Sequence, residues 1–429
     1  MTAEEKKNRM RIVLYTISEL SNTVAIRLFQ VFCAWFFVQI TGEEEYLANV
    51  LIAIWTVTTV FMPVSGIVLE RFNKKSVLFH VSGINLLCSV STWFFFLYGV
   101  DRAAYLFLLV VGVISSLVAS ILMPMATAVI PEITKDEKCI GLGFKLKSSS
   151  FLLGLVLGPV LGGYIVLFFS GIYIMLAASF FALVAVAASV RLGREKTEGE
   201  HGSKGKRGEN SSLIFFKLAM ILWKIPAERS LALCSCCANF LFVPFIFFLL
   251  PSYYVNHGGT VADAATIELA IGAGMLFSSV YLVQAISSVF NNHIAASSGI
   301  VFMAVFLYLF GVLEYPSVFL KILCAIGIGA GLSLFNIVVS TQRAMAIPDG
   351  YRGYMESFLL FFCTLSAPAG IYVSKKMFGV FSEIQIIECF LIFFVLAITC
   401  VCFSGSLKEM LNCKEKEHYN SNYRNLFSQ

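Results

Sequence analysis

Long apolar runs alternate with short polar segments along almost the whole chain. Twelve of these runs are about 20 residues or longer, and within them the apolar positions show no two-residue period. Roughly 20 helical residues cross the ~30 Å hydrocarbon layer of a bilayer, and continuous apolar runs are typical of helices, not of barrel strands. The pattern predicts an all-α membrane protein with transmembrane helices at 12–40, 46–69, 76–98, 104–130, 148–168, 171–192, 229–250, 264–289, 294–313, 317–342, 354–374 and 382–405.

The basic residues support this arrangement. If the N-terminus is cytoplasmic, 26 of the 31 Lys and Arg residues fall in cytoplasmic segments and 4 in outer ones, and Arg27 lies within the first span. Such an excess of cytoplasmic Lys and Arg is typical of cell-membrane proteins. We therefore expect a multi-pass protein of the cell (inner) membrane with both termini in the cytoplasm. Lys375 and Lys376 are exceptions, because they lie on the predicted outer side.

The middle of the chain separates two sets of six predicted helices. Residues 194–212 are charged and rich in Gly, which is typical of a flexible linker. An apolar segment follows at 213–225, with Lys217 and Lys224 on one face, and we expect it to be a short helix on the cytoplasmic membrane surface. The predicted divisions are a cytoplasmic N-terminus (1–11), two six-helix halves (12–193 and 229–405), a cytoplasmic linker (194–228) and a cytoplasmic tail (406–429).

Composition excludes several classes of protein. The chain is 58% hydrophobic and 13% charged with a mean hydropathy of +0.83, far from the ~45–50% and ~25% of soluble domains. It has no nucleotide loop, metal cluster or nucleophile arrangement, so we expect neither an enzyme nor a bound metal. The net charge of +5 is spread over short loops and does not suggest nucleic acid. Cys234, Cys236 and Cys237 lack nearby His or acidic residues and are interpreted as core packing.

The loop after the second span carries a recognisable motif. It reads Gly66-Ile-Val-Leu-Glu70-Arg71-Phe72-Asn73-Lys74-Lys75. This resembles the signature loop of the major facilitator superfamily, Gly-x-x-x-Asp-Arg-x-Gly-Arg-Arg/Lys. Asn73 replaces a Gly of that signature, and because Asn tolerates a left-handed backbone we expect the turn to survive. The resemblance implies a cytoplasmic gate, in which Glu70 sits against the positive N-terminal end of the eleventh helix. The alternative is a basic loop that only sets topology.

A second motif lies in the fifth span. Gly154-x-x-x-Gly158-Pro159-Val-Leu-Gly162-Gly163 is similar to another signature of the superfamily, found mainly in its antiporters. Its small residues allow close helix approach, and Pro159 removes a backbone donor and kinks the helix. A matching small face, at 270–274, lies in the eighth span.

The stretch 128–163 most resembles the branch of the superfamily that contains macrolide-efflux and siderophore-export proteins. The resemblance covers about residues 12–405 and implies export driven by a proton gradient, with no other cofactor. The fourth span lacks the Arg followed by Gln-Gly that many drug/proton antiporters carry. Proton coupling therefore cannot be transferred from that motif.

Arg27 is the leading candidate for a substrate contact. It lies near the middle of the first span, where a charged group is costly, and no strong partner is evident within one turn of its own helix. Its planar guanidinium suits a carboxylate or another planar anion. The alternative is a structural ion pair with Glu19 or with a neighbouring helix.

The resemblance to the major facilitator superfamily implies that the first, fourth, seventh and tenth spans line the substrate path. The other predicted substrate contacts are therefore polar residues within those spans: Gln30, Ser116, Ser120, Asn239 and Asn336. Each can instead bond a carbonyl of its own helix. Glu19 is the candidate proton carrier, because intramembrane carboxyl groups commonly serve in proton relays. Glu356 is interpreted as a favourable helix-start contact, and His293, at a loop edge, carries little information.

The leading hypothesis is a monomeric, proton-coupled exporter of a small amphipathic or anionic molecule. One rival is an importer of the same fold, since direction depends on ion coupling that no motif specifies. A second rival is a translocator that moves lysolipids or lipids between leaflets and needs no proton. A sensor without transport activity would need a signalling domain, which this chain lacks.

Overall fold

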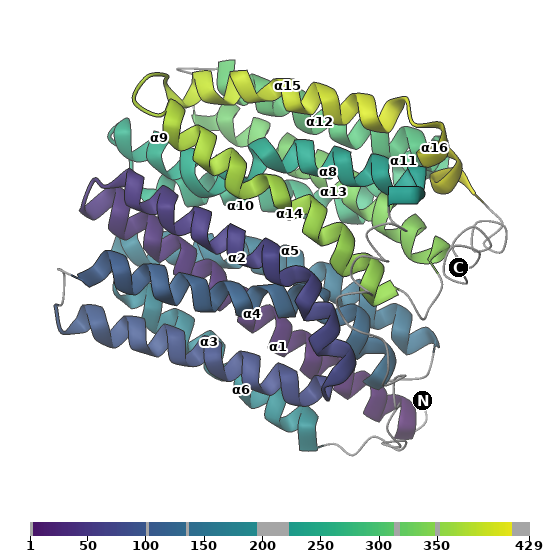
Figure 1. Ribbon diagram of the computed structural model, residues 1–429, viewed down its shortest axis with the longest axis horizontal. Helices are drawn as coiled ribbons and strands as arrows, with labels where there is room; N and C mark the ends of the chain where they lie inside the picture. The colour runs from purple at the N-terminus through teal and green to yellow at the C-terminus, as the bar shows by residue number, and fades with distance from the viewer. Residues whose placement is uncertain are drawn as a thin grey trace. The chain divides into compact units, whose positions relative to one another are not determined.

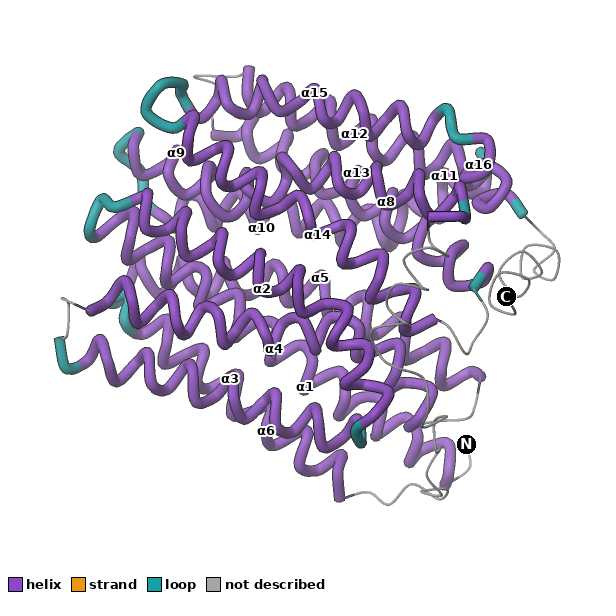
Figure 2. The backbone as a smooth tube through the Cα atoms, in the orientation of Figure 1, coloured by secondary structure: helices purple, strands orange, loops and turns teal. Residues whose placement is uncertain are grey.

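The computed structural model describes residues 3–99, 103–133, 137–194, 223–312, 318–347 and 352–413. These residues are almost entirely helical (Figures 1 and 2), and their only β feature is an isolated bridge between Phe378 and Phe381. Eleven helices in these ranges are long and apolar enough to cross a membrane. The twelfth predicted span falls in α5, whose described apolar stretch is Val156–Phe168. The predicted all-α membrane fold is confirmed.

The helices fall into two compact units. Unit 1 comprises Met1–Leu213 together with Gly259–Ala265, and unit 2 comprises Ile214–Gly258 with Thr266–Gln429. The surface helix predicted at 213–225 lies mostly outside the described residues, of which Trp223 and Lys224 are helical.

Unit 1 is built from six helical spans. The bounds are α1 (Ala3–Ala34) continuing into the π-helix η1 (Trp35–Ile40), α2 (Glu44–Arg71), α3 (Lys74–Leu97), α4 (Ala104–Ile133), α5 (Glu137–Phe168) and α6 (Tyr173–Arg194). α1 packs most extensively against α6 and α5, while α2 packs on α4 and α3 on α6. α1 is therefore the central helix of this unit.

Unit 2 contains two spans interrupted by π-helical turns and four continuous ones. The first is α8 (Pro226–Pro244), η3 (Phe245–Leu249) and α9 (Leu250–Asn256). The second is α10 (Val261–Phe277), whose first turn up to Ala265 belongs to unit 1, followed by η4 (Ser278–Leu282) and α11 (Val283–Val289). The others are α12 (Asn292–Val312), α13 (Val318–Ala346), α14 (Arg352–Met377) and α15 (Glu383–Cys402), followed by the short α16 (Gly405–Asn412). α8 packs against α14 and α15, and α12 packs against α13 and α15.

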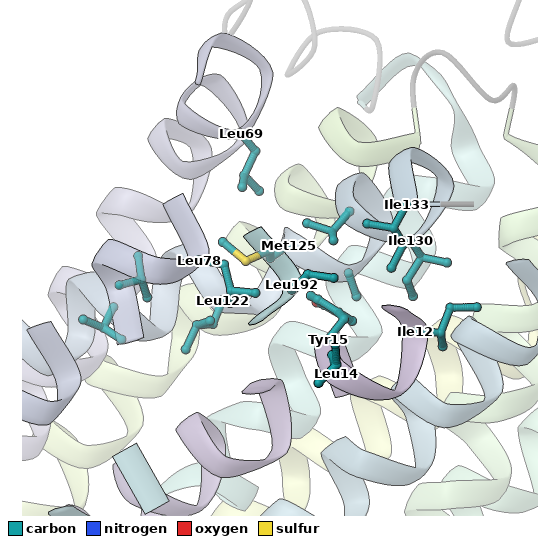
Figure 3. Close-up of a cluster of buried hydrophobic side chains, with 14 residues drawn as sticks. Ile12, Leu14, Tyr15, Leu69, Leu78, Leu122, Met125, Ile130, Ile133 and Leu192 are labelled. Carbon is teal, nitrogen blue, oxygen red and sulfur yellow. The ribbon is translucent and has the colours of Figure 1, made fainter. Parts of the chain in front are cut away.

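The N-terminal part of α1 is anchored in an apolar cluster. Figure 3 shows Ile12, Leu14 and Tyr15 meeting side chains of α2, α3, α4 and α6, among them Leu122 and Leu192. Tyr15 is 1% exposed. The cluster fixes the rotation of α1, and so decides which face carries Glu19 and Arg27.

A buried polar network ties α1 to α3. The Asn22 side-chain amide donates to Ser82 Oγ at 2.8 Å, and the amide of Asn85 donates to Asn22 Oδ1 at 3.0 Å. All three residues are at most 2% exposed. Buried polar groups need such partners, and in membranes side-chain hydrogen bonds help to hold helices together.

The turn before α3 differs from the expected one. Asn73 has φ −61°, not a left-handed conformation, and its side chain accepts hydrogen bonds from the backbone N–H groups of Lys75 and Ser76. Asn73 is thus the N-cap of α3, a position at which Asn is among the preferred residues because it satisfies free N–H groups of the first turn. Hydrogen bonding, and not a permissive backbone, explains Asn at this position.

Three further features of unit 2 were not anticipated. Lys375 and Lys376 lie in the last turn of α14, where positive charge is favoured by the helix dipole, and Lys376 also lies 5.9 Å from the ring centre of Tyr372. The predicted tail begins with α16, which buries Leu407 and Leu411. His293 is also buried: its ring Nε2 lies 2.9 Å from the Val401 carbonyl oxygen, and its backbone N–H donates to Asn412 Oδ1 at 3.1 Å.

Candidate functional site

Arg27 lies in the middle of α1 and is 6% exposed. Its Nη1 donates a 2.9 Å hydrogen bond to Oε1 of Gln30, three residues further along the same helix. The expectation that Arg27 lacks a strong partner within one turn was therefore wrong. Gln30 is neutral, so this hydrogen bond orients the guanidinium without cancelling its charge.

The glycine motif of α5 packs directly on the helix that carries Arg27. A Cβ added at Gly158 would overlap the Cβ of Arg27, and one added at Gly154 or Gly162 would come within 2.7 Å of Thr23 or Val31 respectively. The motif therefore sets the spacing between α1 and α5, as small-residue patterns do in membrane helices. Pro159 and Gly163 are buried in the same stretch, and α5 continues through Pro159 to Phe168.

The face of small residues predicted in the eighth span, at 270–274, packs against another helix of unit 2. A Cβ added at Gly274 would overlap the Ile326 carbonyl oxygen of α13. Gly274 therefore permits a close backbone approach between α10 and α13.

Glu19 lies two turns before Arg27 on α1 and is 6% exposed. Its Oε2 is buried, and the hydroxyl of Tyr15, one turn earlier, interacts with the carboxyl group. The positive charge of Lys147 in α5 attracts the carboxylate form of this group. A buried carboxyl group is costly inside a membrane protein, and Glu19 is therefore a candidate functional group.

Ser116 and Ser120 are buried in α4 and bond within their own helix. Ser116 Oγ donates to the Gly112 carbonyl at 2.6 Å, and Ser120 Oγ donates to the Leu117 carbonyl at 2.8 Å. This is the local bonding weighed above as the alternative to substrate contact.

Asn239 and Asn336 differ in their surroundings within unit 2. The amide of Asn239 in α8 donates to the Cys363 carbonyl of α14 at 2.7 Å, and so joins two helices. Asn336 in α13 is exposed, whereas Ser333, one turn earlier, is 1% exposed. Of the two amides, Asn336 is the more accessible.

The signature loop joins α2 to α3. Gly66 is buried in α2, Arg71 is exposed at its end, and Lys75 is 8% exposed in the first turn of α3. Lys74 Nζ makes a 2.5 Å ion pair with Oε2 of Glu132 at the end of α4. The side chains of Glu70 and Tyr354 and the surroundings of Gly353 lie outside the described residues, and so does the predicted gate contact. The loop thus ties the ends of α2, α3 and α4 together within unit 1.

The sequence interpretation missed a buried ion network in unit 2. Arg343 Nε donates to both oxygens of Glu228, at 2.9 and 3.0 Å, and Arg343 Nη1 donates to Glu356 at 2.5 Å. The side chains of Arg343 and Glu228 are 4% and 0% exposed. Arg343 also donates to the Met355 carbonyl, so it links the start of α8 and the start of α14 to the end of α13.

Glu356 is therefore more than a favourable dipole contact. One signal pointed to this network: a basic residue at one helix end and acids at two helix starts on the same predicted side of the membrane. Residues at matching depth in one bundle can meet, but the sequence does not say which do.

Lys321, counted among the four outer Lys and Arg residues, lies at the start of the predicted span 317–342, and its burial was not anticipated. It lies in the first turns of α13 and is 7% exposed. Its Nζ donates to the Tyr253 hydroxyl at 2.5 Å and lies 4.1 Å from the centre of the Tyr253 ring and 5.6 Å from that of Phe310. Aromatic faces stabilise a cation in this geometry.

Comparisons of the sequence and the structure with known proteins agree with each other. The sequence model of the family described as Major Facilitator Superfamily matches residues 16–371. Among solved structures 273 chains match, one of them the crystal structure of a D-xylose-proton symporter. That match has a TM-score of 0.72 and 12% sequence identity, and it covers 93% of this chain and 98% of the other. No curated protein matches.

Proposed function

Because the chain belongs to the major facilitator superfamily of membrane transporters, we propose that it is a secondary active transporter that exports a small amphipathic or anionic molecule in exchange for protons. The superfamily match supports transport across a membrane by a multi-pass protein. The substrate, the direction of transport and the coupling ion form the proposal.

Arg27 carries the proposal. It is a buried cation in the central helix of unit 1, and its Nη1 donates a hydrogen bond to the neutral side chain of Gln30. Keeping a guanidinium inside a membrane protein is costly unless its charge is used, and it can hold a carboxylate with two parallel hydrogen bonds. An anionic group on the substrate fits this chemistry.

Glu19 is the proposed proton carrier, because it is a buried carboxyl group on the same helix as the proposed substrate contact. Binding of protons and substrate to one helix provides a direct route for coupling the two. The glycine motif of α5, similar to that of antiporters, favours export. We therefore place the protein with drug- or siderophore-exporting members of the superfamily, acting as a monomer in the cell (inner) membrane.

The remaining substrate contacts follow from the accessibility of each group. Gln30 lies beside Arg27 and Asn336 is exposed, so both are proposed to contact substrate. Ser116, Ser120 and Asn239 already make a hydrogen bond, so substrate would have to compete with a carbonyl or use the remaining lone pairs. We rank these three below Arg27.

The substrate can be identified by comparing cells with and without this chain. We expect deletion to raise the intracellular level of one anionic or amphipathic compound and to lower its level in the medium. The opposite pattern would identify an importer. A change confined to lipid asymmetry, insensitive to the proton gradient, would identify a lipid translocator.

Substitution of Arg27 tests the site. Arg27→Lys keeps the charge but loses the planar fork, so the apparent substrate affinity should fall roughly tenfold, the lower part of the range for hydrogen bonds to charged groups. Arg27→Gln should impair transport further. Efflux of the identified compound from proteoliposomes, normalised to the amount of folded protein, measures both effects.

The matched control is Arg191→Gln, which removes an exposed cation from α6 of the same unit and should leave efflux unchanged. If Arg27→Gln protein is well folded and exports at the wild-type rate, the assignment is wrong. If Arg27→Gln instead depletes the folded protein, and neutralisation of a partner restores it, Arg27 is a structural residue.

A further inference from the structure

The contacts between α1 and α5 repeat at regular intervals of four residues. Gly154 faces Thr23, Gly158 faces Arg27 and Gly162 faces Val31, so each pair differs by the same 131 positions. The residue numbers of both helices increase in the same direction along the contact, so α1 and α5 run parallel. Residues four apart lie on one face of a helix, so this register can be followed toward the N-terminal end of both helices.

Two further pairs follow from this register. The next pair is Ser150 with Glu19, both buried, and the one after is Leu146 with Tyr15. Leu146 does pack against the apolar cluster that contains Tyr15, which extends the register beyond the glycines. Lys147 directly follows Leu146 and precedes Ser150 by three residues, so it lies on the side of α5 next to Tyr15 and Glu19.

The facing turn of α1 is unusually polar for a buried surface. Tyr15 Oη, Thr16 Oγ1 and Glu19 Oε2 are buried in this turn, and the Tyr15 hydroxyl interacts with the Glu19 carboxyl. The turn therefore brings a carboxyl group and two hydroxyl groups together inside unit 1. Lys147 is only partly buried, and its long stem can carry the ammonium toward or away from this turn.

Other helices that pack on α1 also carry charged residues near the N-terminal end of α1. These residues are Lys75 in α3, Glu132 in α4 and Arg191 in α6, and Glu132 already forms an ion pair with Lys74. The register places Lys147 on the side of α5 next to Glu19, and its positive charge attracts the Glu19 carboxylate.

We propose that Lys147 is the charge partner of Glu19, and that Tyr15, Thr16, Glu19 and Lys147 form the proton-exchange site of unit 1. This inference rests on the proposed proton-coupled function. When Glu19 is ionised, the Lys147 ammonium compensates its charge. When the carboxylate takes a proton from hydronium and releases water, the attraction is lost and Lys147 moves toward solvent. The pair thus links the protonation of α1 to the position of an α5 side chain, on the two helices that also meet at Arg27.

A double-mutant cycle tests the charge pair without requiring transport. The four proteins are the wild type, Glu19→Gln, Lys147→Gln and the double variant, compared by thermal melting in lipid nanodiscs at neutral pH. Lys147→Gln alone leaves a buried carboxylate without its cation and should lower the melting temperature by roughly 5 °C or more. Adding Glu19→Gln should recover most of that loss. Additive effects in the cycle would overturn the proposal.

The control cycle pairs Glu19→Gln with Arg191→Gln, and these two effects should add. If the Lys147 variants fold too poorly to melt cooperatively, the charge-reversed protein, Glu19→Lys with Lys147→Glu, provides a second measurement. It should melt well above each of its single-reversal parents, and failure to do so contradicts the pairing.

A transport assay separates coupling from a merely structural role. In proteoliposomes, the Glu19→Gln, Lys147→Gln double variant should keep downhill substrate exchange. Its rate of uphill transport driven by an imposed proton gradient should fall about tenfold or more. A structural pair would leave the ratio of uphill to downhill transport unchanged, which would overturn the exchange role. If the wild type ignores the proton gradient while the melting cycle is non-additive, the proposed proton coupling fails and the charge pair stands.

Discussion

Replacing Arg343 with glutamine is expected to cost unit 2 about 3–5 kcal/mol of stability, the range measured when one member of a buried ion pair is removed. Glu228 is fully buried, and both of its carboxylate oxygens accept from the guanidinium of Arg343. Without that cation the carboxylate would be left in an apolar environment, which is far more costly than the loss of a surface pair. We expect a large drop in folded protein, measured by fluorescence-detected size exclusion and thermal melting.

Arg229→Gln is the matched control, because Arg229 directly follows Glu228 but is exposed. It should change stability by no more than ~0.5 kcal/mol, as most surface substitutions do. The double variant Glu228→Gln with Arg343→Gln should be more stable than Arg343→Gln alone, since it removes the buried carboxylate as well. A wild-type melting curve for Arg343→Gln would show that the network contributes little to stability.

Placing leucine at Gly158 is expected to have a comparable effect in unit 1. Even a single added Cβ would overlap the Cβ of Arg27, and a leucine would force α1 and α5 apart. Overpacking of a tight contact costs typically 1–3 kcal/mol, and we expect about 3 kcal/mol here because the neighbouring atom lies close to the backbone and cannot easily move. The same displacement moves Arg27, so transport per folded molecule should fall as well.

Gly83→Leu is the control for this change. Gly83 lies in the middle of α3, and a Cβ added there meets nothing within 4 Å. The substitution should leave both melting temperature and transport near wild type. If Gly158→Leu behaves like Gly83→Leu, the glycine motif does not set the spacing of α1 and α5.

The positions of the membrane helices could be predicted from the sequence because they depend on local quantities. A span requires only enough consecutive apolar residues to cross the hydrocarbon layer, and each helix satisfies its own backbone hydrogen bonds. The twelve predicted spans therefore correspond to helices in the structure, including α5, of which only a shorter apolar stretch is described. The π-helical turns η1, η3 and η4 were not predicted, because the hydropathy pattern does not register one extra residue in a turn.

Local chemistry can also mislead when several conformations satisfy it. Asn73 suits both a left-handed turn and a helix N-cap, and the structure shows the N-cap, because the start of α3 supplies backbone N–H groups that need an acceptor. Lys321 is a single charge near the outer end of a predicted span, where a lysine is usually exposed to solvent. Its burial depends on Tyr253 and Phe310, which come from two other helices.

The sequence alone determined that this is an all-α membrane protein resembling the major facilitator superfamily, and it identified Arg27, Glu19 and the glycine motif as residues of interest. Only the tertiary structure decided what these residues touch: Gln30 beside Arg27, Gly158 against Arg27, and Glu228 and Glu356 on Arg343. The physical reason is that hydropathy and helix length act within one segment. A partner is chosen by the rotation and register of two helices, and many side chains along both helices set these together.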